Sequence, residues 1–458
     1  MALARFGTDG IRGLANEELT TEVAMALGRA SVRVLGADCF LLGRDTRRSG
    51  PMLSAAFAAG VAAEGADAID LGVIPTPGVA TLCAQRSLPG AVVSASHNPF
   101  FDNGIKIFGP GGLKLSEQVE AAIEAELEAI LLDPEHGPAR PVGAEVGQVL
   151  DDHDAAERYV EHLVDSIRPG ALSGMRIVID CANGAGSPFA ERVLSLLGAE
   201  VIVLAASPDG ININDGVGST HPEGLCAAVR EHGASIGLAL DGDADRLVAV
   251  DHLGEVVPGD ALIALFALDL KARRELADDA VVVTVMTNLG FHRAMESAGI
   301  AVREVGVGDR NVLHCLEDES LSLGGEQSGH VIFRQRSTTG DGLLTGLVLA
   351  DLVGRSGEPL ADLSSRVLTL YPQVLTSVRV SSTASLDDAS ALWERIAQRS
   401  DELGDQGRIL VRASGTEPVV RVMVEADDAA VASAIAEELG ALVEAEMGAT
   451  GESESPVA

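Results

Sequence analysis

Short apolar runs alternate with longer segments of helical periodicity from the N-terminus to about residue 368. Runs at 40–42, 91–93, 176–180 and 281–285 have the length and composition of buried strands. Between them, apolar residues recur at helical spacing, as in the segment 21–34. This alternation is typical of α/β domains, in which helices cover the faces of a sheet. The sequence therefore predicts α/β architecture for this part of the chain.

Residues that favour helix ends mark several boundaries. Thr20 or Thr21 can cap the first long helix, and Ser116 can begin another. Ser187 and Pro188 have the order of an N-cap and a first helical residue, and Gly198 would close that helix.

The pattern changes in kind near residue 371. Strands are predicted at 374–380, 408–412 and 419–425, with helices at 386–399 and 428–447. Three strands with only two helices, and without regular alternation of the two, indicate a small α+β domain.

A chain of 458 residues is too long for a single hydrophobic core. We expect four domains around a central cleft: three α/β domains with mixed sheets and a C-terminal α+β domain. Their predicted bounds are 1–151, 152–253, 254–368 and 369–448, followed by a disordered tail at 449–458.

Charge and hydropathy exclude several classes of partner. The formal net charge of −35 would repel a nucleic-acid backbone. No apolar run reaches the roughly 18 residues that a bilayer requires. The N-terminal segment lacks the apolar core of a signal peptide, and the five cysteines form no C-x-x-C pair. We therefore expect a cytoplasmic protein with reduced cysteines, no nucleic-acid partner and no membrane partner.

A candidate nucleophile lies in the segment Ser94-Ala95-Ser96-His97-Asn98-Pro99, where a buried strand ends. The following loop contains Lys106. A hydroxyl beside an imidazole and an ammonium group can accept and stabilise a phosphoryl group. The same six residues also fit an ordinary turn.

The segment Asp241-Gly242-Asp243-Ala244-Asp245-Arg246 places three carboxylates at alternate positions between two apolar runs. Such crowding of negative charge is costly unless a cation offsets it, so a hard divalent metal is the natural interpretation. An EF-hand is excluded because the sixth position is Arg246 instead of glycine. A solvated acidic turn is the alternative.

Two further segments are suited to sugar phosphates. Gly324-Gly325-Glu326-Gln327-Ser328-Gly329-His330 combines groups that bind hydroxyls with a histidine able to move protons, although a lone histidine is often structural. Arg412-Ala413-Ser414-Gly415-Thr416-Glu417-Pro418, with Arg421, gathers guanidinium and hydroxyl groups between two strands. This second set predicts a phosphate site, or else a tight hairpin with solvated arginines.

Taken together and in this order, these loops resemble the α-D-phosphohexomutase family. The resemblance runs from Phe6 to Glu425 and includes the N-terminal segment Phe6–Gly13. It implies that Ser96, and not Ser94, carries a phosphoryl group. It also implies one Mg²⁺ per chain.

The family resemblance also implies the role of each site residue. The Mg²⁺ ligands would be Asp241, Asp243, Asp245 and the Ser96 phosphate. Arg12, His97 and Lys106 would surround the transferring phosphoryl group, with His330 or Lys106 as the general acid/base. The substrate-binding residues would be Arg246, Glu326, Ser328, Arg412, Ser414, Gly415, Thr416 and Arg421.

Within the family, five segments resemble the sequences of one branch, the mutases that act on glucosamine phosphates. These segments are 6–13, 218–223, 324–330, 338–342 and 421–425. The branch implies an isomerase that interconverts glucosamine 6-phosphate and glucosamine 1-phosphate, with glucosamine 1,6-bisphosphate as intermediate or activator. It would supply UDP-N-acetylglucosamine for cell-wall precursors.

The sequence departs from the pattern of this branch at two positions, and three rival functions stay open. Val217 replaces a cysteine and Asn311 replaces a tyrosine, and the second change lies in the expected sugar-binding region. The nearest rival is a mutase of the same family for glucose or mannose phosphates. A phosphohydrolase with an Asp241 nucleophile and a non-catalytic sugar-phosphate sensor are more distant. The oligomeric state is also open, with a homodimer as one option.

Overall fold

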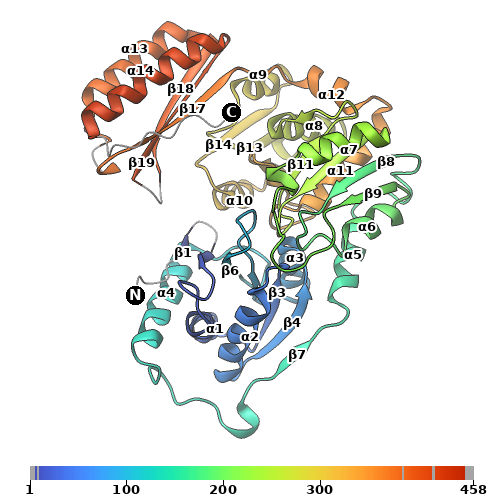
Figure 1. Cartoon of the computed structure of the whole chain (residues 1–458), viewed down its shortest axis with the longest axis vertical. Coiled ribbons are helices and arrows are strands. Elements are labelled where there is room, and N and C mark those ends of the chain that lie inside the picture. Colours follow the sequence, from blue (N-terminus) through green and yellow to red (C-terminus); the bar gives the residue numbers. More distant parts are fainter. Residues whose placement is uncertain (1–5, 8–9, 384–385, 415–417, 449–458) are drawn as a thin grey trace. The chain divides into compact units, whose positions relative to one another are not determined.

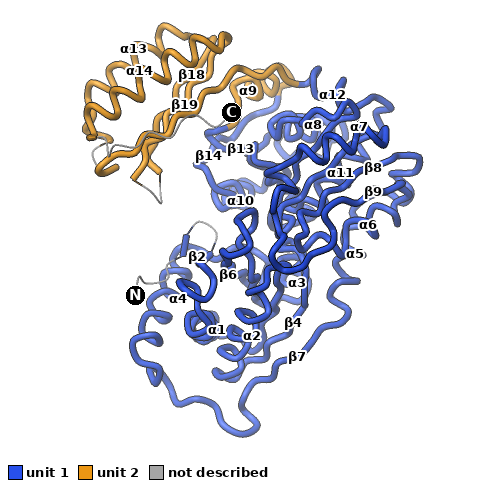
Figure 2. Tube along the Cα trace, in the orientation of Figure 1, with its two compact units in different colours: residues 1–286, 300–367 blue, residues 287–299, 368–458 orange. Residues whose placement is uncertain are grey.

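The computed structural model of the chain describes residues 6–7, 10–383, 386–414 and 418–448. The predicted tail at 449–458 lies outside these residues. The described residues form two compact units (Figure 2): residues 1–286 with 300–367, and residues 287–299 with 368–458. No helix in the described part of the chain is both long and apolar enough to span a bilayer.

The first sheet of the larger unit has the order β1-β2-β6-β5-β3-β4-β7. Strands β3, β4, β5 and β7 are parallel, and β6 runs antiparallel to β5 and β2. Helices α1, α2 and α4 share a hydrophobic core with the sheet. The elements are β1 (Phe6–Gly7), β2 (Gly10–Leu14), α1 (Thr21–Leu35), β3 (Cys39–Arg44), α2 (Gly50–Ala63), β4 (Asp67–Val73), α3 (Thr76–Arg86), β5 (Gly90–Val93), β6 (Asp102–Phe108), α4 (Glu117–Leu132) and β7 (Val149–Asp151).

The second sheet has the order β12-β11-β10-β8-β9, in which β8 is parallel to β9 and β10, and β11 is antiparallel to β10 and β12. Its elements are α5 (Ala155–Asp165), β8 (Arg176–Asp180), α6 (Ala190–Leu196), β9 (Glu200–Leu204), α7 (Glu223–His232), β10 (Ile236–Leu240), β11 (Leu247–Val250) and β12 (Val256–Val257).

The third sheet has the order β14-β13-β15-β16, with only the β15–β16 pair antiparallel among its described strands. Its segment of the chain contains α8 (Gly259–Ala272), β13 (Ala280–Thr284), α9 (Leu289–Ser297), β14 (Ala301–Val305), α10 (Asp309–Asp318), β15 (Leu323–Gly325), β16 (Val331–Phe333), α11 (Gly342–Ser356) and α12 (Leu360–Val367). Mixed sheets with helices confirm the predicted α/β class.

The smaller unit contains an antiparallel sheet of order β17-β19-β18, and α13 and α14 lie together on one face of it (Figure 1). Its C-terminal elements are β17 (Gln373–Arg379), α13 (Ser390–Leu403), β18 (Gly407–Ala413), β19 (Val419–Ala426) and α14 (Ala429–Met447). This arrangement confirms the predicted α+β domain.

Helix α9 belongs to the smaller unit, although the chain enters and leaves it from strands of the third sheet. The Leu289 amide at its start donates to the buried Glu425 carboxylate of β19 over 3.1 Å. Asn288, its N-cap, donates to the Tyr371 carbonyl over 2.9 Å. The smaller unit is therefore assembled from two separate stretches of the chain.

Capping chemistry explains several helix ends, and α6 and α13 begin later than predicted, α13 at Ser390 instead of at residue 386. The Thr20 hydroxyl accepts from the Val23 amide at the start of α1, and Gly36 ends this helix in the left-handed conformation. Helix α6 begins at Ala190 instead of next to Ser187. Residues 187–189 form turns in which the Ser187 and Phe189 amides donate back to Gly184 and Gly186. A Cβ at Gly184 would lie 2.3 Å from the Gly242 carbonyl oxygen, so these turns pack closely on the predicted metal loop at 241–246, and the helix starts after them.

One buried carboxyl group couples the stability of the larger unit to pH. Asp341 caps α11 by accepting from the Leu344 amide, and it also accepts from the Tyr159 hydroxyl, each over 2.9 Å. Burial raises the pKa of Asp341 to about 7 despite these hydrogen bonds. The unfolded chain has an ordinary Asp pKa near 4, so between about pH 4 and pH 7 only the folded chain keeps this proton. Stability from this group therefore falls as pH rises through that range.

We predict that Asp341→Asn raises the melting temperature more at pH 8 than at pH 5, by a few degrees, because asparagine caps helices as well as aspartate does but carries no charge. Differential scanning fluorimetry at the two pH values measures the difference. Asp351→Asn on the same helix is the control. Burial raises the pKa of Asp351, but hydrogen bonds from Arg355 and Arg168 outweigh burial and lower it overall. The contribution of Asp351 changes only below about pH 4, so its replacement should destabilise the chain by the same amount at pH 5 and at pH 8. A difference between the two pH values as large for Asp351→Asn as for Asp341→Asn would contradict the interpretation.

Candidate active site

Ser96 lies in the loop after β5 with its side chain aimed at the second domain. Its hydroxyl donates to Asp241 Oδ2 over 2.6 Å, and its Oγ lies 3.4 Å from His97 Nδ1. The residue is 1% exposed and has a φ of 53°, in the left-handed region that serine rarely adopts. The structure therefore brings the predicted nucleophile against the first of the three predicted metal ligands.

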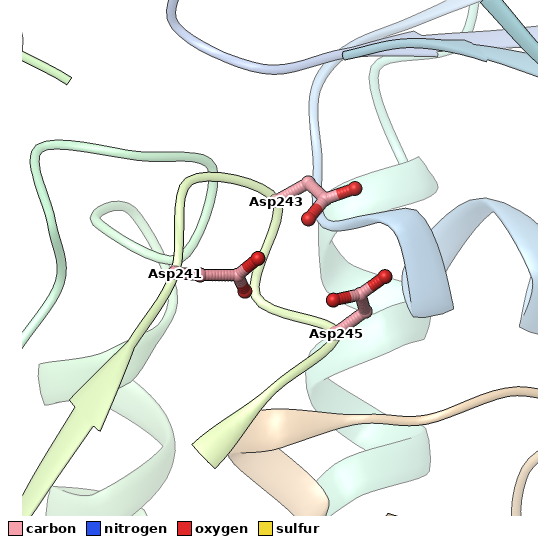
Figure 3. Close-up of side chains that lie close together, drawn as sticks. All are labelled: Asp241, Asp243 and Asp245. Carbon is pink, nitrogen blue, oxygen red and sulfur yellow. The ribbon is translucent and has the colours of Figure 1, made fainter. Parts of the chain in front are cut away.

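The three aspartates follow β10 and point toward a common centre (Figure 3). All are buried, and their ligand oxygens lie within 4.8 Å of one another. Gly242 fits between them only because it has no side chain: a Cβ there would lie 2.5 Å from the Ser96 carbonyl oxygen. Close packing of these two loops therefore sets the distance between Ser96 and the aspartates.

Lys106 and Thr76 hold the second and third aspartates. Lys106, on β6, donates to Asp243 Oδ2 over 2.8 Å and to Asp245 Oδ2 over 3.2 Å. The Thr76 hydroxyl, at the start of α3, donates to the same Asp243 oxygen over 2.7 Å. The first domain thus orients carboxylates that the second domain supplies.

Electrostatics around the aspartates favour a bound cation. Burial, with the charges of Asp245 and Asp243, raises the pKa of Asp241 well above its usual value. Lys106 and Arg246 bring two positive charges to three carboxylates, so this group of side chains keeps a negative excess.

The aspartates fit a hard divalent ion. Asp245 Oδ1 is buried and accepts no hydrogen bond from the described residues. Carboxylate oxygens are the ligands that Mg²⁺ prefers, and in an octahedral site they lie up to about 4.2 Å apart. The residues present therefore match the predicted metal, with Asp241, Asp243 and Asp245 as the protein ligands.

His97 adjoins Ser96, and Arg12 lies close enough to His97 to affect its pKa. Burial lowers the pKa of His97, and the positive charges of Arg246 and Arg12 lower it further. A neutral imidazole next to Ser96 is the expected form near neutral pH. Arg12 is exposed on β2, opposite Gly104 in the register with β6.

The predicted sugar-binding loop is joined directly to the metal loop. The Leu247 amide donates to the Gly329 carbonyl over 3.0 Å, and the Gly342 amide donates to the Ala244 carbonyl over 2.9 Å. Ser328 is exposed next to this junction. The larger unit therefore brings the Ser96, aspartate and sugar-binding loops into one connected network.

Glu326 and His330 are both buried. Glu326 Oε1 accepts from the Gly308 amide over 3.0 Å, and His330 Nε2 lies 3.4 Å from Asp309 Oδ2. Asp309 also pairs with Lys114 of the first domain over 2.6 Å. Asn311, the departure noted in the sequence, donates to the Val307 carbonyl over 3.0 Å and so holds the same loop.

The predicted phosphate site lies in the smaller unit. Arg412 on β18 and Arg421 on β19 are direct partners in the antiparallel register. Burial lowers the pKa of Arg412, and the charge of Arg421 lowers it further. Ser414 donates its amide to the Val419 carbonyl over 2.8 Å. Gly415 and Thr416 lie outside the described residues. Like charges opposite each other repel, and a bound anion would relieve this repulsion.

Sequence reasoning missed the residues that hold Ser96 and the aspartates. Besides Thr76, these are Asp45 and Arg47 after β3, the Ser94 hydroxyl and Asn214. The polar run that begins at Arg44, directly after a buried strand, was the available signal for the first two.

Models of all four domains of the phosphoglucomutase/phosphomannomutase family match the chain in order. The alpha/beta/alpha domains I, II and III match residues 4–133, 157–254 and 258–371, and the C-terminal domain matches residues 375–442. Among solved structures, a phosphoglucomutase/phosphomannomutase family protein from Burkholderia thailandensis has a TM-score of 0.79 at 28% identity, covering 98% of this chain and 99% of that one. The chain belongs to this family of phosphohexomutases.

Relatives of nearly the same length include members of one branch of the family, the phosphoglucosamine mutases. The phosphoglucosamine mutase of Frankia casuarinae is 51% identical over 451 residues, which cover 96% of this chain and 97% of the relative. That of Saccharopolyspora erythraea is 50% identical over 447 residues, with 96% and 99% covered. An N-acetylphosphoglucosamine mutase from Aspergillus fumigatus, solved with GlcNAc-6P and magnesium, shares the fold at a TM-score of 0.71 and 18% identity, covering 97% of this chain and 96% of that one. The resemblance drawn from the loops is confirmed.

We predict that saturating Mg²⁺ raises the melting temperature of the wild-type chain by a few degrees, because a ligand that binds only the folded state stabilises it. Asp245→Asn should abolish most of this rise, since it removes a charged ligand from the buried triad. Asp401→Asn, an exposed change on α13, is the control and should respond like the wild type. An undiminished rise in Asp245→Asn would place the metal elsewhere.

Proposed function

We propose that this chain is a phosphohexomutase that interconverts glucosamine 6-phosphate and glucosamine 1-phosphate, on the route to UDP-N-acetylglucosamine. The observation that carries the proposal is the 2.6 Å contact between Ser96 Oγ and a carboxylate of the buried aspartate triad. It is supported by full-length relatives named phosphoglucosamine mutase at about half identity.

In the first half of the reaction, phospho-Ser96 donates to the sugar. The bond between Ser96 Oγ and phosphorus breaks, and the anomeric oxygen of glucosamine 6-phosphate forms a new bond to phosphorus. The proton of the anomeric hydroxyl passes to a base. Ser96 Oγ returns to the hydroxyl form, and the product is bound glucosamine 1,6-bisphosphate.

His330 is the better candidate for that base. Lys106 donates to two carboxylates, which favours its charged form and a role in stabilising negative charge. His330 has a carboxylate, Asp309, near one ring nitrogen, an arrangement that can orient an imidazole for proton transfer. The base therefore comes from the sugar-binding loop and not from the Ser96 domain.

Charge stabilisation is the main task of the remaining groups, as for phosphoryl transfer in general. Mg²⁺, one per chain and held by Asp241, Asp243 and Asp245, would supply positive charge for the transferring phosphoryl group. Arg12, Lys106 and Arg246 add fixed positive charge from the protein, while the neutral His97 can donate a hydrogen bond to the oxygens of this group.

The far end of the substrate needs its own phosphate site. We assign this to Arg412, Ser414, Gly415, Thr416 and Arg421, with Glu326 and Ser328 for the sugar hydroxyls. In the second half of the reaction the bisphosphate presents its other phosphate to Ser96. The bond between the sugar O6 and phosphorus breaks, O6 takes back a proton, Ser96 is phosphorylated again, and glucosamine 1-phosphate leaves.

We predict that the wild type turns over glucosamine phosphates with a higher kcat/KM than glucose or mannose phosphates. Coupled assays at equal substrate concentrations measure this. A preference for glucose or mannose phosphates would instead favour the phosphomannomutase/phosphoglucomutase branch, and release of free phosphate without isomerisation would favour a phosphohydrolase.

The same preparation tests the nucleophile. Ser96→Ala should show no added phosphate by intact mass and should lose at least about 1,000-fold in kcat, because the covalent acceptor is gone. Ser94→Ala keeps the Ser96 hydroxyl and should still carry the phosphate. A phosphorylated, active Ser96→Ala would contradict the mechanism.

We predict that Arg412→Ala raises KM by at least about 10-fold, because a charge-assisted hydrogen bond to phosphate contributes roughly 1.5–3 kcal/mol. Steady-state kinetics measure KM. Arg395→Ala, on the surface of α13, is the control and should leave KM within about twofold. An unchanged KM in Arg412→Ala would remove this arginine from the phosphate site.

A further inference from the structure

Ser96 is held in an unfavourable backbone conformation, and the residues that hold it lie outside the set that touches substrate. Its φ of 53° places a non-glycine residue in the left-handed region, which costs energy and persists only where the surroundings impose it. The direction of the Ser96 hydroxyl depends on this conformation. The contacts that impose it therefore control where the nucleophile points.

Arg47 binds the Ser96 loop through its backbone carbonyls. Its Nη2 donates to the carbonyls of Ser96 and Asn98 over 2.8 and 2.9 Å, and its Nη1 donates to that of Pro99. The rigid fork of a guanidinium group suits three acceptors in fixed positions, which an ammonium group cannot match.

The charge of Arg47 is deeply buried, with a side-chain exposure of 0%. Its Nε donates to Asp45, also fully buried, over 2.9 Å. Burying such a pair is costly and is weak evidence for a stabilising role. Arginine at this position is instead explained by the geometry that it imposes on the carbonyls.

Asn214, in the second domain, also binds the Ser96 loop. Its Nδ2 donates to the Ser96 carbonyl over 2.9 Å and to the Asn98 carbonyl over 3.0 Å. The Ser96 carbonyl thus receives one hydrogen bond from each domain. Because Gly242 packs against this carbonyl as well, the position of Ser96 is tied to that of Asp241.

The amide of Ser96 is also connected to the ion pair between Asp45 and Arg47. The Ser96 amide donates to the Ser94 hydroxyl over 2.9 Å, and that hydroxyl donates to Asp45 over 2.6 Å. Both the amide and the carbonyl of Ser96 are therefore fixed relative to the Asp45 and Arg47 pair.

We propose that Arg47 and Asn214 are positioning residues for phosphoryl transfer: they act on the Ser96 carbonyl to keep the Ser96 hydroxyl aimed at the metal site. This inference rests on the proposed function, because it assigns Ser96 the phosphoryl group. It adds two residues outside the sets proposed to bind substrate and metal.

The test separates the rate of transfer from the amount of folded protein. Each variant, first dephosphorylated, is mixed with excess glucose 1,6-bisphosphate, and Ser96 phosphorylation is followed by rapid quench and intact mass. The amplitude reports the fraction of competent enzyme, and the rate constant reports the geometry of transfer.

Arg47→Lys keeps the charge next to Asp45 but loses the fork. We expect its phosphorylation rate constant and kcat to fall about 100-fold, the effect of misplacing a reacting group by about 1 Å, with KM within about twofold. Asn214→Gly removes only the side chain, because glycine tolerates the φ of 58° at this position. We expect a fall of about 10-fold, since Arg47 still binds both carbonyls.

Matched controls repeat each substitution nearby. Arg48→Lys changes the exposed neighbour of Arg47, and Asn16→Gly changes an exposed asparagine with a φ of 67°. Both should keep the wild-type rate constant within about twofold.

Two outcomes would overturn the inference. A reduced amplitude with a wild-type rate constant in Arg47→Lys and Asn214→Gly would show that these residues only stabilise the fold. Wild-type values in both variants would show no role at all. Failure of the proposed function is distinguishable: a wild type that is phosphorylated on Ser96 but does not convert glucosamine phosphates refutes the substrate alone, and a wild type never phosphorylated on Ser96 refutes both proposals.

Discussion

Three carboxylates buried within 4.8 Å of one another are the constraint around which the larger unit is organised. Like charges at this distance repel strongly in a buried setting, so hydrogen-bond donors and positive charges gather around them. Lys106 and Thr76 reach them from the first domain, and the Ser96 hydroxyl donates to one of them. The aspartates thereby require the first and second domains to meet at one place, and their remaining negative charge suits a bound cation.

The sheets supply the framework for this meeting. Ser96 follows β5, Arg47 follows β3, Asp241 follows β10 and Glu326 follows β15, so each functional loop begins where a strand of a mixed sheet ends. Loops at strand ends can change sequence without disturbing the sheet, whereas the strands keep their ends in register. Backbone hydrogen bonds between the loops, such as that from Leu247 to Gly329, then join elements that are remote in the sequence.

Much of the fold and part of the site were predictable from the sequence. Periodicity predicted the strands and most helices because burial imposes it directly, and the Asp-x-Asp-x-Asp pattern predicted a shared site because the spacing alone crowds the charges. The predicted start of α6 was wrong because the turns at 187–189 precede the helix. Arg47 and Asn214 were missed for a different reason: they bind backbone carbonyls, and a carbonyl leaves no trace in the identity of the residue that bears it. Only the folded chain shows which carbonyls they reach.

Because the smaller unit is built from two separate stretches of the chain, it affects where the protein can be cut into fragments. A fragment that begins at Leu368 would lack α9, so the Glu425 carboxylate would lose the hydrogen bond from the Leu289 amide and keep those from Arg408 and Gln373. A fragment that ends at Val367 would contain α9 without the segment 368–369 against which Gly290 packs, where a Cβ would lie 2.0 Å from the Thr369 carbonyl oxygen. Cutting the chain at the domain boundary predicted from the sequence would therefore remove contacts from both pieces, and a C-terminal fragment would keep them only if α9 were included.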